Sequence, residues 1–326
     1  MQIKHAIFGL ASLALGAGAA QAEQEIIFGI SAATGSLQQQ TAAEFARIMH
    51  EKLPGKVNVK LFDNSQLGKD EDMLQKVRLG TMHVTLPSST MPEIAPEYAI
   101  FDLPFIVANR DHLARIDDTL FKDVLVPKTE ARGYIPLAVW ENGFRHITNN
   151  ARPINTPADL NGLKIRTPNS SWRVAMFREY GSNPTPMGFS ELFVALQTGV
   201  VDGQENPLTN IAGGKLNEVQ KYLSMTNHVY SPAYPTVGKA TFEKLSPEIQ
   251  QAMREAAQEA ALWARAKGEE EDTTLRDSLV ASGMEMNVAD RASFVAASQP
   301  LYEKFASEVE NGQAMIDQVL SLADGS

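Results

Sequence analysis

Cysteine is absent from this sequence of 326 residues. Its absence excludes disulfide bonds, a thiolate nucleophile and a zinc site with cysteine ligands. A chain of this length can bury a core large enough to fold without such cross-links, and it is long enough for two domains. With 44% hydrophobic and 21% charged residues, the composition is that of an ordinary globular protein.

Several motifs of catalysis and nucleotide binding are missing as well. The sequence contains no GxSxG nucleophile elbow, no P-loop and no HExxH zinc motif. Its six histidines are scattered without the spacing of metal ligands, which favours surface or core positions for them. We therefore expect no enzyme, no cofactor and no metal site.

Basic residues are fewer than acidic ones. The 29 Lys and Arg residues against 39 Asp and Glu residues give a formal net charge of -10. Such a balance repels nucleic acid and anionic membrane surfaces. Neither is an expected partner.

The apolar run at the N-terminus is too short to cross a bilayer with ease. Ala6–Leu15 precedes the small residues Ala20 and Ala22, a pattern typical of a Sec-type signal peptide with its cleavage site. We expect residues 1–22 to be removed, with Glu23 as the first mature residue. Because no cysteine adjoins that site, we expect no lipid anchor and a protein exported to a bacterial periplasm.

Strand and helix patterns alternate along the first part of the chain. Short connections join the segments, an order that predicts a doubly wound α/β domain. The expected elements are strand Ile26–Ile30, helix Gln38–Leu53, strand Val57–Phe62, helix Asp70–Leu79 and strand Met82–Leu86. Further on, we expect helix Asp111–Glu130, strand Leu137–Trp140, a helical segment at Ala212–Tyr222 and strand Leu223–Tyr230.

One long helix is expected near the C-terminus. Ser246 is a typical N-cap, Pro247 suits the first helical position, and Glu248 favours the helix dipole. The apolar spacing continues to Gly283, about 36 residues or ~54 Å. A helix of that length exceeds one domain, so we expect it to brace two. Two further helices are expected between Asp290 and the C-terminus.

Arg166 is the first candidate for a binding residue. Leu163–Arg166 alternates as a short strand and delivers Arg166 to its carboxyl end, where open α/β sheets place their ligand crevices. Its planar guanidinium matches a carboxylate bidentately. From the residue alone, a surface or interdomain salt bridge is the competing interpretation.

The segment after Pro184 leads back toward the same crevice. Phe189 stands just before a predicted helix, which Ser190 and Glu191 are expected to cap and Gly199 to end. The next strand begins near Val200 and brings residues 204–206 to its end.

Other polar and aromatic side chains follow strand ends. Ser31 and Ser88 each follow a strand and can present hydroxyls to a ligand or cap a helix. Glu141 and Arg145 are expected just after a strand, where Arg145 suits a hinge salt bridge or a ligand contact. Trp172 suits ligand stacking or core packing.

Three long segments resemble the signature of one protein family. They are Gly162–Arg166, Pro184–Glu191 and Ala195–Pro207, and weaker similarity covers most of the remaining chain. Together they resemble the periplasmic substrate-binding proteins of TRAP (tripartite ATP-independent periplasmic) transporters, the DctP-like family. The resemblance implies an α/β fold of two lobes with a long helix spanning both. It also implies a membrane permease as partner.

The resemblance carries further expectations for the lobes and the site. Lobe I is expected to comprise 23–142 and 232–268, and lobe II 143–231 and 269–326. Arg166 is implied to pair with the ligand carboxylate. The other implied ligand residues are Arg145, Asn206, Phe189 and Asn169.

The ligand class follows by analogy within the family. The segment Trp140–Arg145 resembles binders of sugar acids such as hexuronates, whose hydroxyls would suit Ser31, Ser88, Asn169 and Glu141. A C4-dicarboxylate or an aromatic 2-hydroxy acid remains an alternative. A periplasmic sugar-acid enzyme and an extracytoplasmic sensor are two further hypotheses.

Overall fold

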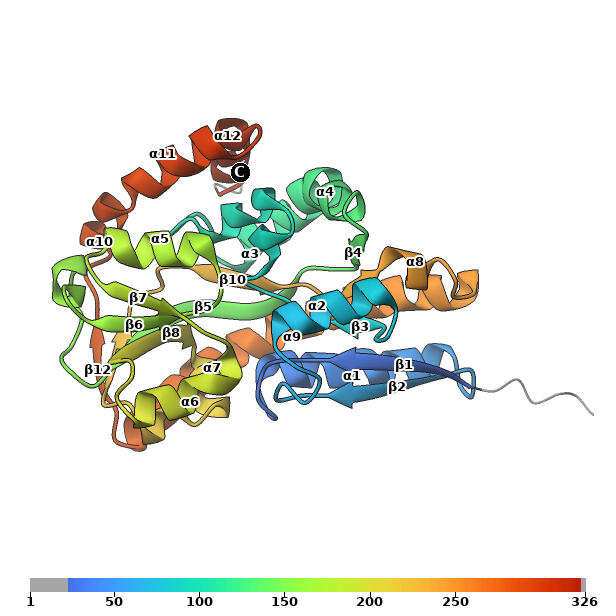
Figure 1. The fold of residues 1–326 in the computed structure, drawn as a ribbon, viewed down its shortest axis with the longest axis horizontal. Helices are drawn as coiled ribbons and strands as arrows, with labels where there is room; N and C mark the ends of the chain where they lie inside the picture. The colour runs from blue at the N-terminus through green and yellow to red at the C-terminus, as the bar shows by residue number, and fades with distance from the viewer. Residues whose placement is uncertain (1–22, 324–326) are drawn as a thin grey trace, which may run out of the picture.

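Two sheets organise the computed structural model, which describes residues 23–323 (Figure 1). The first sheet has the strand order β2-β1-β3-β11-β4. β1 pairs in parallel with β2 and β3, as a doubly wound domain requires, whereas β11 runs antiparallel to its neighbours. Its strands are β1 (Gln24–Gly29), β2 (Val57–Phe62), β3 (Val84–Thr85), β4 (Tyr134–Pro136) and β11 (Thr236–Gly238).

The second sheet has the order β12-β9-β5-β8-β6-β7, and β10 pairs with β5 beside this path. β6 is parallel to β7 and β8, while β5 is antiparallel to β8, β9 and β10. Its strands are β5 (Trp140–Asn149), β6 (Lys164–Thr167), β7 (Asn183–Pro186), β8 (Gly203–Pro207), β9 (Tyr222–Met225), β10 (Tyr230–Ala233) and β12 (Glu285–Val288).

Helices cover both sheets. In Figure 1, α5 and α10 lie on one side of the second sheet and α6 and α7 on the other. The α-helices are α1 (Leu37–Lys52), α2 (Asp70–Leu79), α3 (Arg110–Ile116), α4 (Val126–Glu130), α5 (Ser171–Glu179), α6 (Phe189–Gln197), α7 (Leu208–Gly213), α8 (Lys239–Phe242), α9 (Pro247–Ala281), α10 (Arg291–Ala297), α11 (Gln299–Glu308) and α12 (Gly312–Ser321). Short 3₁₀ helices occupy Met91–Glu93, Pro96–Asp102, Pro157–Leu160 and Leu216–Glu218, and a π-helix occupies Asp117–Leu125.

Local sequence signals place several of these elements. β2 and α2 have the bounds that the sequence predicts, and Gly80 ends α2 at φ 78°, a left-handed conformation that suits glycine. The Ser246 hydroxyl accepts a hydrogen bond from the amide of Ile249, with Pro247 as the first residue of α9. α9 runs for 35 residues and contacts α1 beside the first sheet and β5 and α7 of the second. The α/β fold with two sheets and a long helix between them is confirmed.

Two predicted segments around the second sheet are wrong. Ala212–Tyr222 is not one helix: α7 ends at Gly213, and Lys215 adopts a φ of 53° that an α-helix cannot continue. Leu223–Tyr230 is not one strand, because Asn227 has a φ of 46° and separates β9 from β10.

Two further strand predictions need correction. β5 begins at Trp140 and runs to Asn149, so Glu141 and Arg145 lie inside a strand and not after its end. The predicted strand at residues 137–140 leads into this longer strand and shares only Trp140 with it. Only Val84–Thr85 of the expected strand Met82–Leu86 pairs with neighbours.

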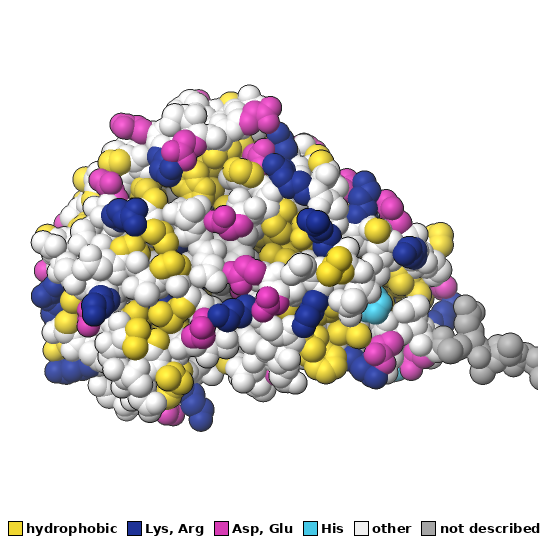
Figure 2. Space-filling view, in the orientation of Figure 1, with side chains coloured by type: hydrophobic (Ala, Val, Ile, Leu, Met, Phe, Trp, Pro, Cys, Tyr) yellow, Lys and Arg dark blue, Asp and Glu magenta, His cyan; other side chains and the backbone are white. Residues whose placement is uncertain are grey.

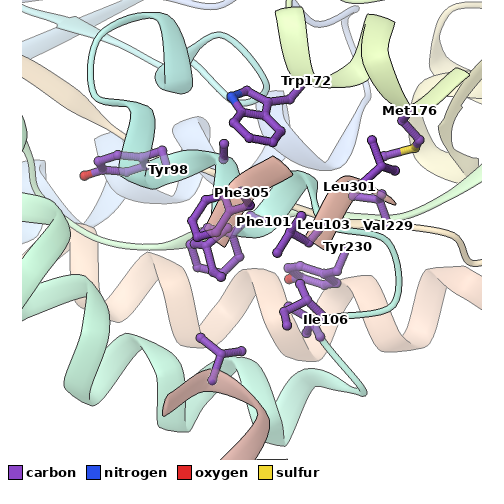
Figure 3. Packing of buried hydrophobic residues seen from close by; sticks show 14 of the residues in the cluster. Tyr98, Phe101, Leu103, Ile106, Trp172, Met176, Val229, Tyr230, Leu301 and Phe305 are labelled. Carbon is purple, nitrogen blue, oxygen red and sulfur yellow. The ribbon is translucent and has the colours of Figure 1, made fainter. Parts of the chain in front are cut away.

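The chain crosses between the sheets at three places. β4 of the first sheet leads into β5 of the second, β10 leads back into β11, and α9 leads to β12. These crossings lie near the expected lobe boundaries, and the division into two lobes stays a prediction. Apolar residues between Met91 and Leu125 share one buried cluster with residues of the second sheet, including Tyr230 of β10 (Figure 3).

The surface is mixed in charge. On the face shown in Figure 2, acidic and basic side chains are interspersed, with small apolar areas between them. Within residues 23–323, no helix has the length and apolar character to cross a membrane.

Candidate functional site

A narrow cavity of about 50 Å³ lies between the two sheets. Its walls come from the loops after β1 and β3, the first turn of α2, the strands β5, β6 and β8, and the start of α6. The carboxyl ends of parallel strands thus meet here, as in other open α/β sheets. The lining residues are Ser31, Ala32, Gln38, Asp70, Leu86, Ser88, Ser89, Thr90, Asn142, Arg145, Arg166, Pro168, Phe189, Asn206 and Asn210.

Arg166 is a buried cation that opens onto this cavity. It is 3% exposed, and its Nε and Nη2 donate to the carbonyl oxygen of Met187 at 3.1 and 2.7 Å. No Asp or Glu among residues 23–323 forms an ion pair with it. Burial lowers the pKa of Arg166 to about 10, because no carboxylate in contact compensates the lost hydration. The remaining N–H groups of its Nη atoms are available to an anion.

Arg145 lines the cavity too, but its fork faces a protein carboxylate. Its Nε donates to Oε2 of Glu205, and its Nη2 donates to Oε1 of Glu205 at 2.8 Å. Nη2 also reaches Oδ1 of Asn206 at 3.2 Å. Burial alone would raise the pKa of Glu205, but Arg145 and Arg173 outweigh it and hold that pKa well below its usual range.

A second buried ion pair lies behind the first. Arg173 of α5 donates to Oδ1 of Asp102 at 2.6 Å, and Oδ2 of Asp102 accepts from the Ser170 hydroxyl at 3.1 Å. Both partners of the pair are almost fully buried. Arg145 and Arg173 therefore each have a close carboxylate, whereas Arg166 has none among residues 23–323.

Two histidines of the buried network are neutral at neutral pH. Burial, with His228 and Arg145 nearby, lowers the pKa of His146 to about 3. Burial also lowers the pKa of His228, although Nε2 of His228 lies 3.3 Å from Oε2 of Glu205. Neither side chain lines the cavity.

Four other predicted site residues line the cavity. Ser31 and Ser88 face the cavity from the first sheet, and Phe189 and Asn206 from the second. The Ser88 hydroxyl donates to the carbonyl of Pro232 at 2.6 Å. The predicted capping of α6 by Glu191 is confirmed, because the amide of the N-cap Gly188 donates to Oε2 of Glu191 at 3.0 Å. Ser190, the second predicted capping residue, makes no cap hydrogen bond in the described part of the chain.

Three predicted ligand residues lie outside the cavity lining. Trp172 packs in the core, edge-on to Phe305 with the ring centres 5.6 Å apart (Figure 3). Glu141 is buried and accepts from Nε of Arg110 at 3.0 Å through both carboxylate oxygens. Asn169 points across the cavity rim and donates to Oε1 of Glu71 at 2.8 Å.

Polar contacts join the two sides of the cavity at its rim. Lys69 at the start of α2 pairs with Glu191 of α6 at 2.7 Å. The amide and hydroxyl of Ser171 both donate to Oε1 of Glu93 at 3.0 Å. Together with the bond between Asn169 and Glu71, these contacts link α2 and Met91–Glu93 to α5, α6 and the segment before α5.

Asp70, Asn142 and Asn210 are among the lining residues that sequence reasoning did not name as ligand residues. Asp70 looked like an ordinary acid in the first turn of α2, and Asn210 lies in α7, which the prediction did not contain. Asn142 is recognisable only once β5 is known to continue through it. Residue type alone carried no signal for any of them.

Comparisons with known proteins agree with this geometry. The family model "bacterial extracellular solute-binding protein, family 7", named DctP, matches residues 28–308. The chain belongs to this family. DctP-family relatives are solute-binding proteins and not enzymes. The 2,3-diketo-L-gulonate-binding periplasmic protein YiaO of Escherichia coli (strain K12) is 35% identical over 320 residues, which cover 97% of each chain.

Solved structures of TRAP periplasmic solute-binding proteins share the DctP fold. One from Polaromonas sp. JS666, bound to D-erythronate, is 34% identical with a TM-score of 0.88 and covers 93% of this chain and 100% of its own. Another, from Sulfurospirillum deleyianum DSM 6946 with bound succinate, is 31% identical with a TM-score of 0.87 and covers 92% of this chain and 99% of its own. The family thus includes binders of hydroxylated acids and of dicarboxylates.

Proposed function

We propose that this protein captures a small carboxylate between its two lobes in the periplasm and delivers it to a TRAP membrane permease. The observation that carries the proposal is Arg166. A guanidinium that is buried without a carboxylate partner loses hydration that only an incoming anion can replace. The family membership of the chain supports transport as the purpose of this binding.

The site residues of the proposal are those that line the cavity. Arg166 forms the ion pair with the ligand carboxylate, and Asn206 contributes amide hydrogen bonds. Phe189 packs against the carbon skeleton. Arg145 acts mainly by holding Glu205 and Asn206 in position, because its own fork is engaged with them.

Within this function, the finer substrate class that we propose is a hexuronate or a related sugar acid. Many hydroxyl and amide groups face the cavity, and Ser31, Ser88, Ser89, Thr90 and Asn142 all lie on its walls. Polyhydroxylated ligands match such a lining. The relatives that bind 2,3-diketo-L-gulonate and D-erythronate support this class, and the one with succinate keeps a C4-dicarboxylate as the alternative.

A thermal-shift screen of residues 23–326 tests the function. The panel contains hexuronates, aldonates, C4-dicarboxylates and aromatic 2-hydroxy acids. A ligand at about 100 times its Kd should stabilise the protein by roughly 2.7 kcal/mol, a shift of several degrees in Tm. Arg166→Ala should abolish the shift, whereas Arg178→Ala, at an exposed position of α5, should keep it. Equal responses of the two variants would contradict the role of Arg166.

A further inference from the structure

Asn210, which lines the cavity, has an unused hydrogen-bond acceptor. Its Nδ2 donates to Oδ1 of Asn142 at 3.0 Å and to Oδ1 of Asn206 at 3.3 Å. Since both partners are oxygens, the amide has a fixed orientation with its own Oδ1 on the opposite side. That oxygen is buried and has no hydrogen-bond partner among residues 23–323. A buried acceptor without a donor is costly, so a ligand group that donates to it would gain binding free energy.

Asp70, which lines the cavity from the start of α2, has a second unused acceptor. Its Oδ1 is buried and likewise has no partner within the described part of the chain. Asp70 is the first residue of α2, where the helix N-terminus favours a negative charge. Burial raises the pKa of Asp70 to about 6, so the carboxylate is mainly ionised at neutral pH. The Thr90 hydroxyl, also on the cavity wall, has no partner either among the residues described.

The cavity therefore offers a ligand one cation and two acceptors. Arg166 supplies a cation for one carboxylate, whereas Asp70 and Asn210 offer acceptors. A second carboxylate on the ligand brings acceptors only and, near Asp70, a charge of the same sign. A hydroxyl brings a proton for either acceptor. Sites built to bond a substrate hydroxyl reject analogues that lack it, because their own buried groups are then left unpaired.

We propose that Asp70 and Asn210 make the cavity selective for monocarboxylates that carry several hydroxyl groups, and that they exclude dicarboxylates of the same length. This inference rests on the proposed carboxylate-binding function. It assigns the discrimination to two residues of the cavity lining. Arg166, in contrast, binds the carboxylate that both ligand classes share.

Length-matched ligands separate the two classes. D-erythronate and succinate each have four carbons, and D-galactonate and adipate each have six. Calorimetric titration of residues 23–326 should show one hydroxylated acid binding roughly 10- to 100-fold more tightly than the dicarboxylate of its length. Preference for succinate or adipate, or for the ammonium-bearing 4-aminobutyrate, would overturn the inference while leaving carboxylate binding intact. If no carboxylate binds at all, the proposed function itself fails.

Two variants assign the preference to residues. Asp70→Asn keeps the shape but removes the charge and offers an amide donor, so the ratio of hydroxylated acid to dicarboxylate affinity should fall at least about tenfold. Asn210→Ala removes an acceptor that only a donating group can use, so it should weaken the hydroxylated acid more than the dicarboxylate and lower the same ratio. Asp123→Asn, at an exposed position outside the cavity lining, makes the same charge change and should alter neither affinity. An unchanged ratio in folded Asp70→Asn, with native circular dichroism, would refute the assignment.

Discussion

Gly268 of α9 and Glu141 of β5 touch so closely that no side chain fits between them. A Cβ atom added at Gly268 would lie 2.4 Å from Oε1 of Glu141. Glu141 is held there by Arg110, which also reaches Asp272 of α9 at 2.8 Å. The contact joins the long helix to β5 near the point where the chain crosses between the sheets. It explains why a glycine occupies the interior of a long helix.

Gly268→Ala should therefore destabilise the protein, although alanine is the better helix former by roughly 0.5–1 kcal/mol. The added methyl group must displace Glu141 or α9, and we expect a loss of about 1–3 kcal/mol in urea unfolding. Gly213→Ala is the matched control, because its Cβ would meet its nearest neighbour at 3.5 Å. Stabilisation by Gly268→Ala would show that the contact is not restrictive.

Arg166→Met should raise the stability of the unliganded protein. The side chain loses hydration without gaining a carboxylate partner in contact, so its removal should stabilise the fold by about 1–3 kcal/mol. Arg173→Met should do the opposite and cost about 3–5 kcal/mol, because it leaves Asp102 buried without its cation. Chemical denaturation of both variants measures the contrast. A loss of stability in Arg166→Met would mean that its bonds to Met187 outweigh its desolvation.

His146 should make the protein sensitive to mild acid. Its pKa is about 3 in the fold, against about 6.5 in an unfolded chain, so the unfolded state binds more protons below pH 6.5. Stability should then fall by about 1.4 kcal/mol per pH unit between pH 6 and pH 4 through this residue. His146→Gln should flatten the pH dependence of unfolding, whereas substitution of the exposed His50 should not. An unchanged slope would exclude His146 as the source.

Lys69→Met should shorten the lifetime of the ligand complex. The ion pair with Glu191 joins the two sides of the cavity, so its loss should speed ligand release by about two- to fivefold with little change in association. The effect should shrink at high salt. Lys56→Met removes an exposed pair with Glu248, away from the cavity lining, and serves as the control in stopped-flow kinetics. Equal release rates for the two variants would rule out this contribution.

Much of the scaffold was readable from the sequence because the signals are local. Alternation gave the bounds of β2, amphipathic spacing with Gly80 gave α2, and Ser246 with Pro247 gave the start of α9. The errors arose where the bounds of an element depend on pairing between strands that are distant in sequence. β5 extends through Glu141 and Arg145 because β8, β9 and β10 pair with it, which no local pattern reveals.

The sequence by itself determined the family, the alternation of strands and helices, and Arg166 at the end of a strand. These follow from periodicity, capping residues and three long motifs. Each of these signals lies within one continuous segment of the sequence. Only the tertiary structure decided which charges cancel. Arg145 and Arg173 meet carboxylates from distant segments, Arg166 pairs with none in the described part of the chain, and Asp70 lines the same cavity. Charge compensation depends on distances of a few ångströms between segments far apart in sequence, and folding alone sets those distances.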